Sequence, residues 1–255
     1  MTNRECDLFL ECVLEIGKRF VATGCEVRRV EDTVNRICRA YGFEQCEVYA
    51  VTSFIVVTIK NDDGRHFTQS VRVQSSGTDL GRLEQLNAQS RYICTNTPEV
   101  NELAEMIRSY TPPKPKKLLK CIGYMLAAGG FAIFFGGGIA DGLCAATIAI
   151  LIYLMDYNFK LKQINSAIYT FVESVVSSCL ALMLVHIGIG VSADMITIGD
   201  VMLFVPGLQL VNAVKEMFNK DIVTGIYRLV EAVLVALAIG GGIALSYIIV
   251  GGLPI

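Results

Sequence analysis

Among the charged side chains in the most apolar half of the chain, three lie well inside apolar stretches, where a charge is costly to bury. Glu173 belongs to the apolar stretch 168–190, and Arg228 and Glu231 belong to the stretch 222–250. A buried carboxyl group can take up and release protons because burial disfavours its charged form. Arginine can hold a carboxylate through two parallel hydrogen bonds. These residue types therefore predict a pathway in which a carboxylate-bearing substrate moves together with protons.

Another apolar stretch, 195–214, contains a predicted helix break followed by two amides. Pro206 removes a backbone N–H donor and Gly207 loosens the next residue, so carbonyl groups are left free to bind a ligand. Gln209 and Asn212 are three residues apart and share one helix face below the break. We therefore expect all four residues to contribute to the same pathway.

Helix geometry predicts similar depths for the two glutamates and the break. Glu231 lies nine residues from the start of its stretch, and Glu173 lies eleven residues from Lys162 at the basic end of its own, or roughly 14–17 Å at 1.5 Å per residue. Pro206 is nine residues from Lys215. The three features are therefore predicted to share one layer near the middle of a bilayer.

Structural explanations compete with transport for these features. Arg228 precedes Glu231 by three residues, so the two side chains can pair on one helix face, or Arg228 can extend to the nearby membrane surface. Proline kinks also occur in ordinary membrane helices. Asp141 and Asp200 lie nearer the opposite ends of their stretches, and we expect both to be solvated.

Five membrane-spanning helices account for the apolar half. Residues 118–155 include only two charged side chains but are too long for one span, so a turn at 136–142 should divide them into two helices. The other three spans are expected at 168–190, 195–214 and 222–250. Runs of glycine and alanine within these stretches predict close packing between helices.

Lysines favour one orientation of these spans. They occur before the first span, between the second and third, and between the fourth and fifth, at positions 114, 116, 117, 120, 160, 162, 215 and 220. The opposite loops, GGGIADG, GIGVSAD and GGLPI, contain none. Because basic residues accumulate in cytoplasmic loops, the N-terminal half is predicted to be cytoplasmic and the C-terminus to lie outside.

The N-terminal half has the pattern of a small α+β domain. Apolar residues recur at helical spacing over 9–20 and 27–41, and two further helices are expected at 79–92 and 98–110. The segments CEVYAVTSFIVVTI and RHFTQSVRV predict strands joined by a hairpin at NDDG. The expected organisation is a cytoplasmic domain over 1–112, a basic proline-rich linker over 113–120 and a transmembrane domain over 121–255.

Composition excludes several functional classes. The net charge of −2 gives no basic surface for nucleic acid. Nine cysteines occur without a CxxC pair, and there are only two histidines, so we expect neither a metal site nor a disulfide framework. The acidic N-terminus lacks the apolar core of a cleaved secretory signal. The sequence has no GxSxG turn and no histidine in an acid–base motif, so we expect no catalytic residue, no cofactor and no enzyme.

Several segments together resemble the threonine/serine exporter family. The matching pieces are GCEVRRVE, TSFIVVTI followed by a hairpin and SVRV, DLGRLEQLNAQSR, GGGIADG and PGLQLVNAVKEMFNKDIVTGIYRLVEA. Through the first piece, the resemblance adds Arg29 and Glu31 as a cytoplasmic motif. Without the resemblance these two residues would be interpreted as a solvated helix face.

The resemblance implies a secondary exporter of small carboxylate-bearing metabolites, such as threonine and serine or, in split relatives, a dicarboxylate such as succinate. Long members of the family fuse a second set of spans to the first. A separate small integral membrane protein is therefore expected to complete the transporter in the cell membrane, with a homo-oligomer as the alternative. The competing function is a membrane-anchored sensor or scaffold whose cytoplasmic domain binds a ligand.

Overall fold

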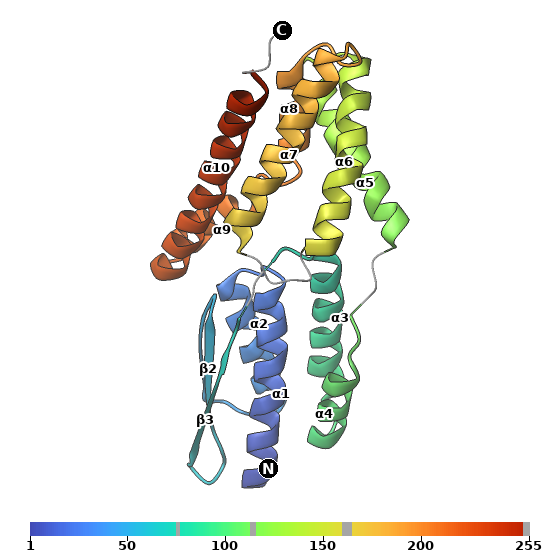
Figure 1. Ribbon diagram of the computed structural model, residues 1–255. Coiled ribbons are helices and arrows are strands. Elements are labelled where there is room, and N and C mark those ends of the chain that lie inside the picture. The colour runs from blue at the N-terminus through green and yellow to red at the C-terminus, as the bar shows by residue number, and fades with distance from the viewer. Residues whose placement is uncertain (75–76, 113–115, 160–164, 252–255) are drawn as a thin grey trace. The chain divides into compact units, whose positions relative to one another are not determined.

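The computed structural model describes residues 1–74, 77–112, 116–159 and 165–251, and the chain divides into two compact units (Figure 1). The N-terminal unit comprises residues 1–114 and 211–228, and the C-terminal unit comprises residues 115–210 and 229–255. Residues 211–228 therefore belong with the N-terminal unit, although the sequence-based organisation assigned them to the transmembrane domain.

Among the described residues, the N-terminal unit contains four complete helices, most of α9 (Gly207–Phe218), the first turns of α10 (Ile222–Gly251), and a three-stranded antiparallel sheet in the order β1-β2-β3. The helices are α1 (Asn3–Ala22), α2 (Val27–Ala40), α3 (Leu80–Asn96) and α4 (Val100–Ser109), and the strands are β1 (Cys46–Val51), β2 (Phe54–Lys60) and β3 (His66–Arg72). All four helices were predicted, with shifted ends. The α+β character of this part is confirmed.

The sheet differs from the predicted hairpin in one respect. The segment expected to be one long strand is divided into β1 and β2, because the chain reverses at Thr52-Ser53 and Val51 pairs with Phe54. The predicted hairpin at NDDG is confirmed between β2 and β3, where Lys60 pairs with His66. Gly64 adopts a φ of 79° in this turn, a conformation that glycine accepts without strain.

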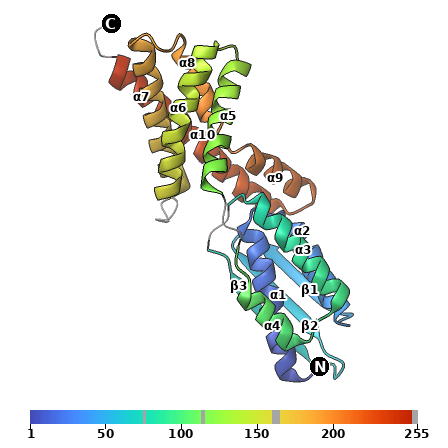
Figure 2. The ribbon, with the colours of Figure 1, turned by 90° about the vertical axis from the view of Figure 1, so that its right-hand side faces the viewer.

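The core of the N-terminal unit is formed by α1 to α4 together with the sheet, and Figure 2 shows α1 lying across the sheet. Ile55, Val57 and Ile59 alternate along β2 and are fully buried, whereas their sequence neighbours are more exposed. Helix α1 approaches β2 closely at Gly17, where a Cβ atom would lie 3.2 Å from the Ile55 Cδ1 atom. This alternation is what a sheet with one buried face requires.

The C-terminal unit is helical. It contains α5 (Lys117–Phe134), α6 (Ile139–Phe159), α7 (Ser166–His186), α8 (Ala193–Val201) and most of α10 (Ile222–Gly251). Within the described part of the chain, four helices are long and apolar enough to cross a membrane, namely α5, α6, α7 and α10. The turn that separates α5 from α6 lies at the predicted glycine run.

The predicted span 195–214 is not one continuous helix. Helix α8 ends at Val201, and α9 (Gly207–Phe218) begins after five intervening residues, the last of which is Pro206. The predicted break is therefore present, and this predicted span is not among the four described helices that are long and apolar enough to cross a membrane. Pro206 explains the interruption because it cannot donate a backbone hydrogen bond to a preceding turn.

Close packing of small residues in the C-terminal unit is confirmed. A Cβ atom on Gly129 would lie 2.7 Å from the Gly142 carbonyl oxygen, and one on Gly242 would lie 2.8 Å from the Phe171 carbonyl oxygen. Helix backbones therefore approach each other at these glycines, as in other membrane proteins. Lys114, Lys160, Lys162, the linker residues 113–115 and the C-terminal residues 252–255, all used in the sequence predictions, lie outside the described residues.

Candidate functional site

One face of α7 is polar and buried inside the C-terminal unit. Thr170, Glu173, Ser174, Ser177 and Ser178 recur at spacings of three and four residues, and each is 5 % exposed or less. Ser174 donates a hydrogen bond to the Ile239 carbonyl oxygen of α10 at 2.9 Å. Because this face points into the unit rather than outward, it can line a polar route between apolar helices.

Glu173 belongs to a network of two carboxyl groups and two tyrosines contributed by α5, α6 and α7. The Tyr169 hydroxyl oxygen lies 2.5 Å from the Glu173 Oε1 atom and 3.1 Å from the Asp156 Oδ1 atom. Tyr124 donates a hydrogen bond to the other carboxyl oxygen of Asp156. Asp156 is 6 % exposed and Glu173 is 3 % exposed, so the network is shielded from solvent. The sequence predictions included Glu173 but missed the other three.

Asp200 on α8 is fully buried, so the prediction that it is solvated is wrong. Neither of its carboxyl oxygens has a hydrogen-bond partner among the described residues, and the buried Thr197 hydroxyl on the same helix also lacks one. A buried carboxyl group with no partner is costly unless it binds a proton or another ligand. Asp200 therefore joins the candidate site.

Asp141 is also buried, at 1 % exposed, and the prediction that it is solvated is wrong as well. Its carboxyl group accepts hydrogen bonds from the backbone N–H groups of Gly138 at 3.0 Å, Val191 at 2.7 Å and Ser192 at 3.0 Å. These bonds tie the start of α6 to the loop before α8. Asp141 therefore has a structural role that its position in a glycine-rich loop did not indicate.

The two amides near the break fall in different units. Gln209 belongs to the C-terminal unit, is half-buried, and has a buried Oε1 atom with no hydrogen-bond partner among the described residues. Asn212, also half-buried, belongs to the N-terminal unit. The expectation that both amides serve one pathway therefore applies more directly to Gln209.

Arg228 is paired with Glu216 rather than with Glu231. Its Nε atom lies 3.3 Å from Glu216 Oε2, and the side chains of Arg228 and Glu216 are 7 % and 1 % exposed. The contact does not have hydrogen-bond geometry at Glu216 Oε2. Arg228 also donates a hydrogen bond to the Cys25 carbonyl oxygen at 2.8 Å. Its guanidinium group therefore binds the backbone just before α2.

Glu216 completes a set of contacts that we call the anchor, made of Gly24, Cys25, Val27, Glu216 and Arg228. The Val27 N–H group donates to Glu216 Oε1 at 3.2 Å, and Arg228 also contacts the Gly24 carbonyl oxygen at 3.5 Å. Burial raises the pKa of the Glu216 carboxyl, although the Arg228 charge and the Val27 N–H group act in the opposite direction. The anchor fastens the α9–α10 connection to the start of α2.

The remaining predicted residues lie apart from the anchor. Glu231 is half-buried on α10 and makes no hydrogen bond or ion pair with the described residues. Arg29 donates to the Asn87 Oδ1 atom at 3.1 Å, and Glu31 accepts the Ala50 N–H group at 2.9 Å. Burial raises the pKa of the Glu31 carboxyl, an effect that the Ala50 N–H group only partly offsets.

Comparison with known proteins gives this arrangement a context. Residues 11–250 match the family described as "Putative threonine/serine exporter". The chain belongs to the threonine/serine exporter family. The family is one of membrane transporters rather than enzymes, so this chain is a membrane-embedded transport protein.

A relative within the threonine/serine exporter family is the "Probable succinate transporter subunit YjjP" of Klebsiella aerogenes. It is 25% identical over 246 residues, which cover 94% of this chain and 91% of the relative. No solved structure matched the chain.

Membership of the exporter family draws attention to the buried polar groups that sequence reasoning missed. Asp156 lies just beyond the apolar stretch that the sequence delimited, and Tyr124 and Tyr169 are ordinary residues of membrane helices. A signal for Tyr169 was present, because it precedes Glu173 by four residues and so shares its helix face. Nothing in the sequence indicated that Asp156 would meet them.

Proposed function

We propose that this chain is one subunit of a secondary exporter that moves a small carboxylate-bearing metabolite out of the cytoplasm in exchange for protons. The observation that carries the proposal is the buried network of Glu173, Tyr169, Asp156 and Tyr124 within the apolar C-terminal unit. Ionisable residues inside membrane helices are rare and are associated with ion and substrate pathways. A protein that is only anchored in the bilayer has no use for them.

The hydrogen count of this network suits proton exchange. The Tyr169 hydroxyl carries one hydrogen but contacts both carboxyl groups, so it can donate to one and must accept from the other. A proton on one of the two carboxyl groups supplies a hydrogen that the Tyr169 oxygen can accept while its own hydrogen goes to the other. A proton arriving from either side of the membrane can then enter or leave with little rearrangement.

The broken segment supports a substrate route next to this network. Five crossings result if α8, the interruption at 202–206 and the first turn of α9, which belongs to the C-terminal unit, together form one discontinuous crossing beside α5, α6, α7 and α10. Discontinuous helices recur at the substrate sites of secondary transporters. An odd number of crossings, with lysines on one side, gives a cytoplasmic N-terminal unit and an outside C-terminus.

A carboxylate substrate is favoured by the relative's name, which specifies succinate, and by the family's, which specifies threonine and serine. The relative is also named as a subunit, which favours a second membrane protein as the partner of this chain. Alternating access requires two facing halves, so either that protein or a second copy of this chain must supply the other wall.

The proposal is tested by efflux of labelled succinate and threonine from proteoliposomes containing this chain and its partner subunit. Glu173→Gln retains the side chain's size and its contact with Tyr169 but cannot exchange a proton, so proton-driven efflux should be lost at unchanged protein abundance. Glu84→Gln, an exposed acid on α3, serves as the matched control and should transport as the wild type does. Wild-type proton-driven efflux by the Glu173→Gln variant would refute the proposal.

A further inference from the structure

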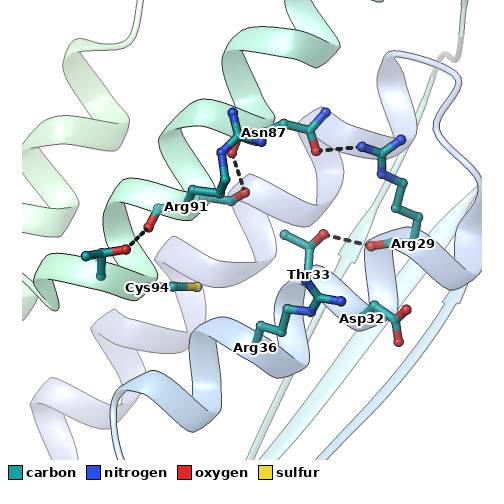
Figure 3. A pocket seen from close by; sticks show the side chains of 9 residues that line it. Arg29, Asp32, Thr33, Arg36, Asn87, Arg91 and Cys94 are labelled. Carbon is teal, nitrogen blue, oxygen red and sulfur yellow. Dashed lines mark hydrogen bonds between the residues drawn. The ribbon is translucent and has the colours of Figure 1, made fainter.

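The N-terminal unit contains a cavity of about 490 Å³ between α2 and α3, shown in Figure 3. Its size is within the range of small-molecule binding sites. Nothing in the transport proposal uses it. The residues that line it are Arg29, Asp32, Thr33 and Arg36 from α2 and Asn87, Ser90, Arg91, Cys94 and Thr95 from α3.

Helical spacing explains why three arginines gather in this cavity. Arg29 and Arg36 are seven residues apart, which is two turns of α2, so both lie on the face that meets α3. Arg91 follows Asn87 by four residues on α3 and faces them from the other side. Two helix faces thus place three guanidinium groups around one concave surface.

The hydroxyl groups of the cavity have already used their hydrogens within the protein, and Asn87 has used one of its two N–H groups. The hydroxyl groups of Thr33, Ser90 and Thr95 donate to backbone carbonyl oxygens at 2.8, 3.0 and 3.0 Å. The Asn87 amide nitrogen donates to the Leu83 carbonyl oxygen at 2.8 Å. The charged donors left for a ligand are the guanidinium N–H groups, beside the second N–H of Asn87 and the weakly donating thiol of Cys94.

Charge in the cavity is unbalanced. Three arginines face one carboxylate, Asp32, and none of the three makes an ion pair with a described residue. Elsewhere in the unit, basic side chains do find acidic partners: Arg19 binds Glu15 at 2.9 Å, and Arg228 binds Glu216. Positive charge is therefore concentrated at the cavity, and a bound anion would balance it.

We propose that this cavity binds a small anionic metabolite carrying at least two carboxylate or phosphate groups. Arg36 and Arg91 are the principal ligands, because each offers a planar fork that matches two oxygen atoms of one anionic group. Arg29 is held in place by Asn87 and contributes its remaining N–H groups. Two or more anionic groups are needed because the guanidinium groups face the cavity from two helices, with Arg29 and Arg36 two turns apart on α2 and Arg91 on α3.

The position of the cavity on α2 gives such binding a route to the α9–α10 connection. The Val27 N–H group, which Glu216 accepts in the anchor, is only two residues from Arg29. An anion that fixes α2 against α3 therefore acts on the helix to which α9 and α10 are fastened. This site is separate from the carboxyl network of the C-terminal unit, and its existence does not depend on the proposed transport.

Calorimetric titration of the full-length protein in detergent at low salt tests the site, with citrate and pyrophosphate as probes. We expect saturable binding of at least one probe, which weakens as salt is added. Arg36→Gln and Arg91→Gln should each reduce the affinity about tenfold, the effect of losing one charge-assisted contact. Asp32→Asn should increase the affinity because it removes the only negative charge in the lining.

Two control variants make the outcome specific. Arg72→Gln removes the same charge from an exposed position on β3 and should bind as the wild type does. Glu173→Gln should also leave binding unchanged, because Glu173 belongs to the other unit. The proposal is overturned if the wild type shows no saturable binding of either probe, or if Arg72→Gln weakens binding as much as Arg36→Gln. It is also overturned if binding depends on Glu173 rather than on Arg36 and Arg91, since the ligand would then occupy the transport pathway.

Discussion

Replacing Glu216 with alanine should open the anchor and expose Cys25. In the wild type, Cys25 is 3 % exposed, and burial raises the pKa of its thiol to about 11. The thiol is therefore both shielded and protonated at neutral pH, so it should react slowly with maleimide. Reaction requires a local opening that frees the segment before α2.

The size of the effect follows from the contacts that are lost. Removing one member of a buried ion pair costs about 3–5 kcal/mol, because the remaining charge stays buried. We expect the lower end of that range, since Arg228 keeps the Cys25 carbonyl oxygen at 2.8 Å and its contact with Glu216 is not an aligned hydrogen bond. A loss of about 3 kcal/mol corresponds to a labelling rate roughly a hundredfold higher, if the rate follows the open population.

The assay is maleimide labelling of the full-length protein, with the rate at each cysteine followed by peptide mass spectrometry. Cys12 is the internal control, because it is also buried and its thiol pKa is also raised to about 11, but it lies on α1 away from the anchor. Lys215→Gln, which breaks the more exposed ion pair with Glu26, should change the Cys25 rate by less than about fivefold.

Two results would refute this reasoning about the anchor. If the Cys25 labelling rate is unchanged in Glu216→Ala, the ion pair does not hold the segment closed. If Cys12 accelerates as much as Cys25, the substitution has unfolded the unit instead of opening one contact. The double variant Glu216→Leu with Arg228→Met should recover most of the protection, because it leaves no unpaired buried charge.

Three further outcomes are expected. Asp200→Asn retains the side chain's size but removes its ionisable group, so proton-driven efflux should fall at unchanged abundance; wild-type efflux would remove Asp200 from the pathway. The pKa of the Glu31 carboxyl is raised in the folded protein, so its ionisation, as pH rises above the ordinary pKa of 4.5, costs folding stability. The melting temperature of Glu31→Gln should therefore fall less than that of the wild type as pH rises above 4.5. An equal change of melting temperature with pH in the two proteins would contradict this. Gly199→Ala would place a methyl group 2.5 Å from the Ala128 carbonyl oxygen and should destabilise the protein by about 1–3 kcal/mol in thermal unfolding. The control is Gly130→Ala, whose methyl group would meet open space. Equal effects of the two variants would be evidence against close packing at Gly199.

Local features of the fold were predictable because they depend on neighbouring residues. The turn at Gly64 follows from the residue types of NDDG, and the buried face of α2 follows from apolar residues at helical spacing. The helix break at Pro206 follows from the chemistry of proline itself. In each case the information lies within one or two turns of the chain, so no knowledge of distant partners is needed.

The contacts of Arg228 were not predictable in the same way. Depth was counted from Ile222, which placed Arg228 inside the bilayer. However, α10 has 30 residues and is about 45 Å long, whereas the hydrocarbon core is about 30 Å thick. The first turns can therefore lie outside the hydrocarbon, where Glu216 is the partner. Similarly, the burial of Asp200 depends on how α8 is rotated against its neighbours, which its apolar sequence does not specify.

The polar residues between Phe204 and Ala232 thus serve more than one purpose, and this affects how transport mutants should be interpreted. Gln209 belongs with the C-terminal unit, whereas Glu216 and Arg228 belong to the N-terminal unit and hold its residues 211–228 against the start of α2. A variant of Arg228 that loses efflux would fit substrate binding, but it would fit an opened anchor equally well. The two explanations separate only if the Cys25 labelling rate is measured on the same variant. Lost efflux with a protected Cys25 would assign Arg228 to the substrate, and lost efflux with an exposed Cys25 would assign it to the anchor.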